Sequence, residues 1–148
     1  MKLMIKKSDL LDIPCSEYNN LPDGKFDAIK EIAKRGNYTE HVGWLMANCK
    51  LAQTTKMLEY FKSRNPLAGN VCLLMENCRF TRTAKMLEYF KSLKPSAEDV
   101  SSLITNCKFA QTTKTLEYFN SLNPSAYNIS WLIGHCKFAK KYFDKIGI

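Results

Sequence analysis

Histidine is scarce in this sequence, which has two, at positions 41 and 135. The six cysteines include no Cys-x-x-Cys spacing, and His135 and Cys136, although adjacent, would diverge by about 100° on a helix. General acid–base catalysis relies most often on histidine, and structural zinc sites need closely spaced cysteine and histidine ligands. We therefore expect no enzymatic activity, no metal site, no cofactor and no small-molecule substrate.

Long apolar runs are also missing, since no stretch approaches the ~20 apolar residues that a membrane-spanning helix needs. The segment from Met1 to Lys7 begins like a signal peptide, but its apolar run stops at once and Asp9 and Asp12 follow. We expect no export signal and no membrane partner.

Arginine is rare, with four among 22 basic residues. Bidentate recognition of bases and phosphates favours arginine over lysine. The net charge of +8 lies outside residues 1–49, whose basic and acidic side chains cancel. This basic excess indicates an acidic partner.

The sequence does contain a repeat with a period of 29 residues. A cysteine preceded by Asn, or by His in the last copy, marks each unit at Asn48-Cys49, Asn77-Cys78, Asn106-Cys107 and His135-Cys136, and a proline keeps the same step at Pro66, Pro95 and Pro124. Repetition at a fixed period in this range is typical of stacked supersecondary units that cannot bury their apolar faces alone.

Each unit predicts two helices. The first, over 96–107 in the third unit, starts with a capping-box-like Ser96 and has apolar residues at i, i+3, i+4 and i+7. A short turn at Lys108 would follow. The second helix, Phe109 to Leu122, would bury Phe109, Leu116 and Phe119 with Thr113 on the same side, and end before Asn123-Pro124.

These units predict an all-α fold, a right-handed α-solenoid of about four 29-residue helix-turn-helix repeats in a single domain. Residues 1–24 would form a short irregular N-terminal cap, and residues 25–148 the helical-repeat domain. Lys25 to Arg35 would be a divergent second helix, and the lysine-rich end after Phe138 a terminal cap. The tandem helix pairs of residues 25–148 resemble α-solenoid repeats such as the HEAT, armadillo and tetratricopeptide classes in architecture. That resemblance implies a binding scaffold.

Four cysteines share one repeat position, Cys49, Cys78, Cys107 and Cys136. Stacked units would place neighbours ~8–10 Å apart, beyond the ~7 Å Cα separation that a disulfide tolerates. We expect small buried side chains in a reducing, cytoplasmic compartment, with no disulfide partner for Cys15 or Cys72.

Basic residues recur at the turn, and they are the main candidate for partner binding. The predicted cationic edge consists of Lys50, Arg79, Lys108 and Lys137, extended by Arg82, Lys140 and Lys141. A second basic series, Lys56, Lys85 and Lys114, precedes Glu59, Glu88 and Glu117 by three residues, which predicts neutralising ion pairs on the second helix. The turn series has no acidic residue so placed, and it either keeps the chain in solution or binds a polyanion.

Asn48, Asn77, Asn106 and His135 adjoin this edge. Their side chains would either satisfy carbonyls at the helix end or contact a partner beside the basic edge. Tyr60, Tyr89 and Tyr118 would either pack or offer a contact surface.

We expect a non-enzymatic binding module for an acidic protein surface. Near-identical repeats in a lysine- and asparagine-rich chain would suit an inhibitor or adaptor of viral or mobile-element origin. The alternative is a nucleic-acid-binding repeat protein that contacts phosphates through the turn series.

Overall fold

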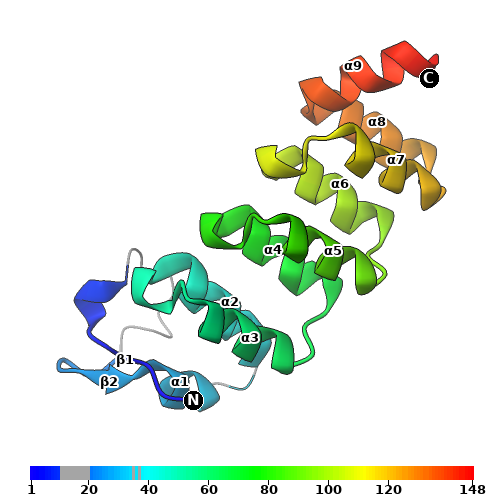
Figure 1. Cartoon of the computed structure of the whole chain (residues 1–148). Coiled ribbons are helices and arrows are strands. Elements are labelled where there is room, and N and C mark those ends of the chain that lie inside the picture. The colour runs from blue at the N-terminus through cyan, green and yellow to red at the C-terminus, as the bar shows by residue number, and fades with distance from the viewer. Residues whose placement is uncertain (11–20, 35, 37) are drawn as a thin grey trace. The chain divides into compact units, whose positions relative to one another are not determined.

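Helices dominate the computed structural model, which describes residues 1–10, 21–34, 36 and 38–148 (Figure 1). The predicted all-α class is confirmed at this level. The α-helices of the described residues are α1 Ala28–Ala33, α2 Tyr38–Asn48, α3 Thr55–Ser63, α4 Ala68–Asn77, α5 Ala84–Ser92, α6 Ala97–Asn106, α7 Thr113–Ser121, α8 Ala126–His135 and α9 Lys137–Ile146. The 3₁₀-helices are η1 Lys7–Asp9, η3 Lys50–Ala52, η4 Arg79–Thr81 and η5 Lys108–Ala110. None of the described helices is long and apolar enough to cross a membrane.

The first helix of each pair, α2, α4, α6 or α8, lies where the sequence predicts it. Ser96 begins α6 with a capping box: its hydroxyl accepts a 3.1 Å hydrogen bond from the Asp99 nitrogen, and the Asp99 carboxylate accepts one of 3.0 Å from the Ser96 nitrogen. Ser125 and Asn128 form the same box on α8. The predicted apolar face of α6 is fully buried and consists of Val100, Leu103 and Ile104.

The second helices α3, α5 and α7 begin later than predicted. In the third unit, residues 108–110 form η5, Phe109 is 39% exposed, and Thr113 is exposed as well. The predicted burial of both side chains is therefore wrong. The helix starts after Thr112, whose hydroxyl accepts a 3.2 Å hydrogen bond from the Thr115 nitrogen and thereby satisfies a donor that has no partner within the helix. Thr54 and Thr83 cap α3 and α5 in the same way.

The second helices end in left-handed backbone. Asn65, Lys94 and Asn123 have φ of 52°, 54° and 51°, and each precedes a proline. A residue in the αL region ends a helix, and the following proline cannot continue it. The predicted stop is confirmed.

The described chain divides into two compact units, of which the N-terminal unit comprises residues 1–66 and 77–81. Here β1 (Met4–Ile5) pairs antiparallel with β2 (Phe26–Asp27), where the sequence predicts an irregular cap and the start of a helix. Asp27 links the two strands to α1, because its carboxylate caps α1 through the Ile29 nitrogen and also accepts a 3.1 Å hydrogen bond from the Leu3 nitrogen. The rest of the predicted cap, residues 11–20, and Arg35 lie outside the described residues.

Helix α1 is shorter than the predicted Lys25 to Arg35 helix, but it buries the predicted residues. Ile29 and Ile32 are 5% and 3% exposed, and α1 packs against α2. Within the same unit, the thiol of Cys78 donates a 3.4 Å hydrogen bond to the Met46 carbonyl oxygen, so residues 77–81 lie against α2.

The C-terminal unit comprises residues 67–76 and 82–148. Helix α4 contacts α6 through the Cys72 thiol, which lies 3.3 Å from the Asp99 carbonyl oxygen. Helix α6 then packs against α8, and α7 against α9, where the Phe119 and Phe143 rings meet edge to face at 6.4 Å. Within this unit, successive first helices are therefore neighbours, as are α7 and α9.

The repeated cysteines are buried and free, as predicted. Cys49, Cys78 and Cys107 are 0% exposed and Cys136 is 4% exposed. Cys72 is buried as well, while Cys15 lies outside the described residues.

Candidate binding surface

A basic side chain follows each cysteine that ends a first helix. At Cys107 the backbone leaves the helical region, with φ of −123° and ψ of 101°, and Lys108 then opens η5. The four residues at this position are exposed, and none forms an ion pair with a described residue. We call Lys50, Arg79, Lys108 and Lys137 the turn cations.

An exposed apolar side chain stands next to three of the turn cations. Leu51 is 52% exposed, Phe80 37% and Phe109 39%, whereas the third residue of each 3₁₀-helix, Ala52, Thr81 or Ala110, is fully buried. A 3₁₀-helix has three residues per turn, so one side chain can anchor it in the core while the other two face solvent. The exposure of these apolar residues was not predicted from the sequence. Their recurrence at the 29-residue step was the available signal.

Arg82 was predicted to extend the cationic edge, but its guanidinium binds backbone carbonyls instead. Its Nε donates a 2.9 Å hydrogen bond to the Met75 carbonyl oxygen, and its Nη2 donates to the Glu76 carbonyl oxygen, at the end of α4. Gln53 and Gln111 stand at the same repeat position and bind the Met46 and Ile104 carbonyl oxygens at 3.1 and 3.0 Å. Arg82 is thus a helix cap, because the last carbonyls of a helix lack partners within it.

At the asparagine position of the repeat, Asn48 and His135 contact the helix end. Asn48 Nδ2 donates to the Trp44 carbonyl oxygen at 2.9 Å, and His135 Nδ1 lies 2.7 Å from the Trp131 carbonyl oxygen. Asn106 instead reaches Ser102 and, in the preceding repeat, Glu76. Asn77, at the same repeat position, also has an interaction partner.

The prediction that Glu59, Glu88 and Glu117 neutralise the second basic series is wrong for the two glutamates whose ion pairs are seen. Glu59 and Glu88 pair with Lys62 and Lys91, three residues further along, at 3.1 Å in both cases. Lys91 also lies 5.3 Å from the centre of the Tyr118 ring, where a cation is attracted to the π face. Lys56, Lys85 and Lys114 are exposed and form no ion pair with a described residue.

Helix α9 adds exposed cations in the last repeat. Lys140 and Lys141 are exposed, as is Lys145, while Ala139 and Phe143 face the core. The helix begins directly at Lys137, so this repeat has no 3₁₀ turn before its second helix. Lys140 occupies the position of the cap Arg82.

The side chains considered as metal ligands or as a Cys/His pair can be located among the described residues. No group of three or more His, Cys, Asp or Glu side chains there could hold a metal ion. His135 is exposed and stacks on Trp131, whereas Cys136, the extended residue between α8 and α9, is buried. Burial, together with the negative charge of Glu76 at 3.2 Å, raises the pKa of the Cys72 thiol far above its usual value, so this thiol stays protonated.

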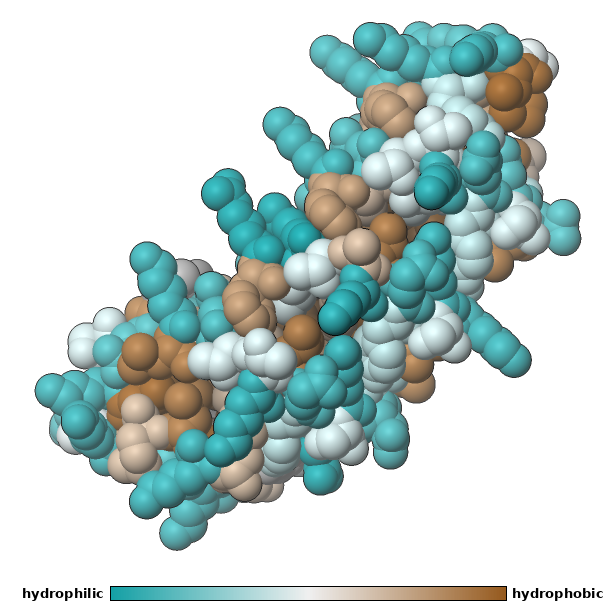
Figure 2. Space-filling model, viewed as in Figure 1, coloured by the Kyte–Doolittle hydropathy of each residue, from teal (hydrophilic) through white to brown (hydrophobic). Residues whose placement is uncertain are grey.

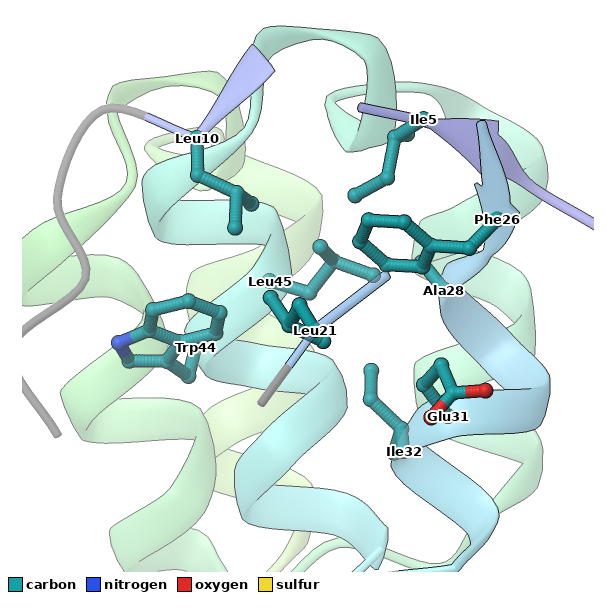
Figure 3. A pocket seen from close by; sticks show the side chains of 9 residues that line it. All are labelled: Ile5, Leu10, Leu21, Phe26, Ala28, Glu31, Ile32, Trp44 and Leu45. Carbon is teal, nitrogen blue, oxygen red and sulfur yellow. The ribbon is translucent and has the colours of Figure 1, made fainter. Parts of the chain in front are cut away.

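An apolar pocket lies inside the N-terminal unit, where side chains from β1, β2, α1 and α2 converge (Figure 3). Its open space of about 10 Å³ has room for no more than one water molecule. Ile5, Phe26 and Leu45 are almost fully buried around it. Hydrophobic side chains also gather on the visible surface of this unit (Figure 2). We interpret the pocket as a packing seam in the core.

Comparison with known proteins gave no match: no family model fits the chain, and neither a curated protein nor a solved structure is significantly similar to it.

Proposed function

We propose that this protein is a non-enzymatic helical-repeat binding module whose turns engage a partner protein surface that is both acidic and apolar. The observation that carries the proposal is the pairing of an exposed cation with an exposed apolar neighbour in the turns that contain Lys50, Arg79 and Lys108. Protein interfaces are enriched in aromatic side chains, and complementary charges at their rim orient the partner.

The proposal needs the repeats to stack in register as a right-handed α-solenoid, which would bring the turn cations to one edge. Contacts within each unit support this arrangement. In the C-terminal unit, α4, α6 and α8 are successive neighbours, and in the N-terminal unit the turn that contains Arg79 lies against α2.

The energetics assign different tasks to the two kinds of side chain. An exposed ion pair contributes only about 0–1 kcal/mol, so the turn cations would mainly steer and orient the partner. Burying apolar surface contributes about 25 cal/mol per Å². Leu51, Phe80 and Phe109 would therefore supply much of the affinity.

A second candidate is nucleic-acid binding. It is favoured by the unneutralised Lys56, Lys85 and Lys114, which add cations to those of the turns, and by the exposed rings of Phe80 and Phe109. Aromatic rings stack on bases regardless of sequence, and lysines contact phosphates as point charges. Binding of this kind would be weak, sequence-independent and sensitive to salt.

Fluorescence anisotropy of the full chain with two labelled probes tests both candidates. The probes are a peptide of alternating glutamate and leucine and a mixed-sequence single-stranded oligonucleotide, each titrated at several salt concentrations. We expect the peptide to bind and Ser substitution of all four turn cations to weaken it at least tenfold. A control variant with Ser at four exposed lysines outside the turns should change it less than twofold; these are Lys2, Lys6, Lys25 and Lys30.

Replacing Phe80 and Phe109 with Leu separates the candidates. Leucine keeps apolar area but cannot stack, so peptide binding should stay within twofold while any oligonucleotide binding falls. A preference for the oligonucleotide with a log–log salt slope of roughly −0.7 per phosphate contact, reduced in the turn-cation variant, would reverse our ranking. An equal loss of peptide affinity in the turn-cation variant and the control variant would refute specific binding through the turn cations.

A further inference from the structure

The basic residues of the chain are absent from one set of helices. Helices α2, α4, α6 and α8 contain no Lys or Arg, and all of their residues belong to the described part of the chain. Their only charged residues are acidic, and they are Glu40, Glu76, Glu98 and Asp99. A chain with net charge +8 thus carries a set of helices with the opposite charge preference.

In the C-terminal unit, this set of helices contains a groove between α6 and α8. It has a volume of about 230 Å³, which is below the ~300–1,000 Å³ of pockets for drug-sized ligands. The lining residues are Glu98, Ser101, Ser102, Tyr127, Asn128 and Trp131. The size suits a single long side chain with a short stretch of backbone, rather than a cofactor.

One wall of the groove is aromatic. Tyr127 and Trp131 are four residues apart on α8, so both lie on one side of that helix. Tyr127 is 71% exposed although the ring is large. The Trp131 ring is held in place by His135, which stacks on it at 4.6 Å with an interplanar angle of 23°. The Trp131 ring is therefore fixed from one face by His135, and the Tyr127 ring is open to solvent.

The facing wall on α6 is acidic and polar. The exposed Glu98 forms no ion pair with a described residue. Ser102 is held by the Glu76 carboxylate, which accepts its hydroxyl at 2.7 Å. Glu76 also forms no ion pair with a described residue, so its charge adds to the negative potential near this wall.

We propose that this groove binds an arginine side chain in an extended peptide segment of a partner protein. A guanidinium stacks on aromatic rings, pairs with a carboxylate through two hydrogen bonds and is more weakly hydrated than an ammonium. The groove offers both recognition elements, with Tyr127 and Trp131 for stacking and Glu98 for pairing. This site has the opposite charge preference to the turn cations, and it does not depend on the function proposed for them.

The test uses ¹⁵N-labelled full-length protein and the capped peptide Gly-Gly-Arg-Gly-Gly, followed by NMR. The two tryptophans give an internal comparison, since Trp131 lines the groove and Trp44 lies in the N-terminal unit. We expect the Trp131 indole signal to move with saturation while the Trp44 signal stays. The same peptide with citrulline, which keeps the shape without the charge, should bind at least fivefold more weakly, and a lysine peptide should lie between them.

Glu98→Gln has a matched control in Glu40→Gln. Both acids are exposed, lie in the first turn of a first helix and occupy the same repeat position, so both variants lose a similar favourable interaction with the helix dipole. We expect Glu98→Gln to weaken binding at least fivefold and Glu40→Gln to leave it unchanged. Tyr127→Ala, at an exposed position, should weaken it about threefold with an unchanged circular dichroism spectrum.

Three results would overturn the proposal. One is that the Trp131 signal does not move at peptide concentrations up to about 5 mM, which corresponds to the weakest affinity of interest. Another is equal binding of the arginine and citrulline peptides. A third is a shift of the Trp131 signal on dilution without peptide, which would mean that a second copy of the chain occupies the groove.

Discussion

The carboxylate of Glu76 accepts a 2.7 Å hydrogen bond from the Ser102 hydroxyl and thereby joins α4 to α6. The same oxygen lies 3.2 Å from the Cys72 thiol and 3.4 Å from Asn106 Nδ2. One charged group thus collects donors from two successive first helices. A hydrogen bond to a charged acceptor is stronger than one between neutral groups, so this contact fixes the register of two repeats.

We expect Ser102→Ala to lower the free energy of unfolding by about 1.5–3 kcal/mol, because the half-buried carboxylate loses its shortest hydrogen bond. Ser130→Ala, at an exposed position on α8, should change it by less than about 0.5 kcal/mol. Urea denaturation followed by circular dichroism measures both. Equal stabilities of the two variants would contradict a structural role for the Glu76–Ser102 contact.

Thr112→Ala should destabilise the protein by about 1–2 kcal/mol, because it removes the cap of α7 and the partner of the buried Thr115 hydroxyl at 2.9 Å. Thr113→Ala, one residue later on the exposed surface, should be nearly neutral. Thermal unfolding of the two variants checks this. The reverse order would support the start at Phe109 that the sequence suggested.

Lys94→Asn should stabilise the protein by about 0.5–1 kcal/mol, because Asn adopts αL backbone more readily than Lys. The other two repeats already have Asn65 and Asn123 at this position. The reciprocal change, Asn123→Lys, should destabilise by a similar amount. Melting temperatures would move by roughly 2–4 °C per kcal/mol for a chain of this size. Shifts of the same sign in both variants would be inconsistent with a backbone origin.

Arg82→Gln should be tolerated, because Gln53 and Gln111 perform the same capping at the equivalent positions. Arg82→Ala should cost about 1–2 kcal/mol, since the end of α4 loses its hydrogen-bond donors. Peptide binding should survive Arg82→Gln but weaken with Arg79→Ser in the same assay. A loss of binding on Arg82→Gln at unchanged stability would return Arg82 to the binding surface.

The stability of the protein should fall at alkaline pH through Cys72. Burial and the nearby Glu76 raise the pKa of this thiol, so the folded state holds a proton that the unfolded state releases above its ordinary pKa of about 8.5. Stability from this source is complete below that pH and decreases as the pH rises, by up to about 1.4 kcal/mol per pH unit. Chemical denaturation between pH 8 and 10 should show a shallower decline for Cys72→Ala. Parallel declines for both proteins would count against the raised pKa.

Local features of the repeat could be predicted from the sequence. The buried face with Val100, Leu103 and Ile104, the buried cysteines and the stop before each proline all follow from helical spacing and proline geometry, which depend on neighbours in the chain. The exposure of Phe109 could not be predicted in this way. An aromatic residue in a repeat is usually buried, and only the packing of Ala110 beneath the 3₁₀ turn shows that the ring faces outward.

The candidate surface shows the same division. The turn cations could be identified from the sequence because no acidic residue follows any of them by three positions, the spacing of a helical ion pair. The capping role of Arg82 and the ion pair between Glu59 and Lys62 could be assigned only from the tertiary structure. Each of these side chains has several possible partners, and the sequence does not show which one it contacts.

By itself, the sequence determined the 29-residue period, the helical class and the positions at which basic and apolar side chains recur. Periodicity and local backbone preference carry that information directly. Only the tertiary structure decided which of those side chains cap a helix and which remain exposed beside the turns. It also decided that Glu98 lines the same groove as Tyr127 and Trp131. Those outcomes depend on contacts between different elements, such as Arg82 with Met75 or α6 with α8, whose geometry is set by packing rather than by the order of the chain.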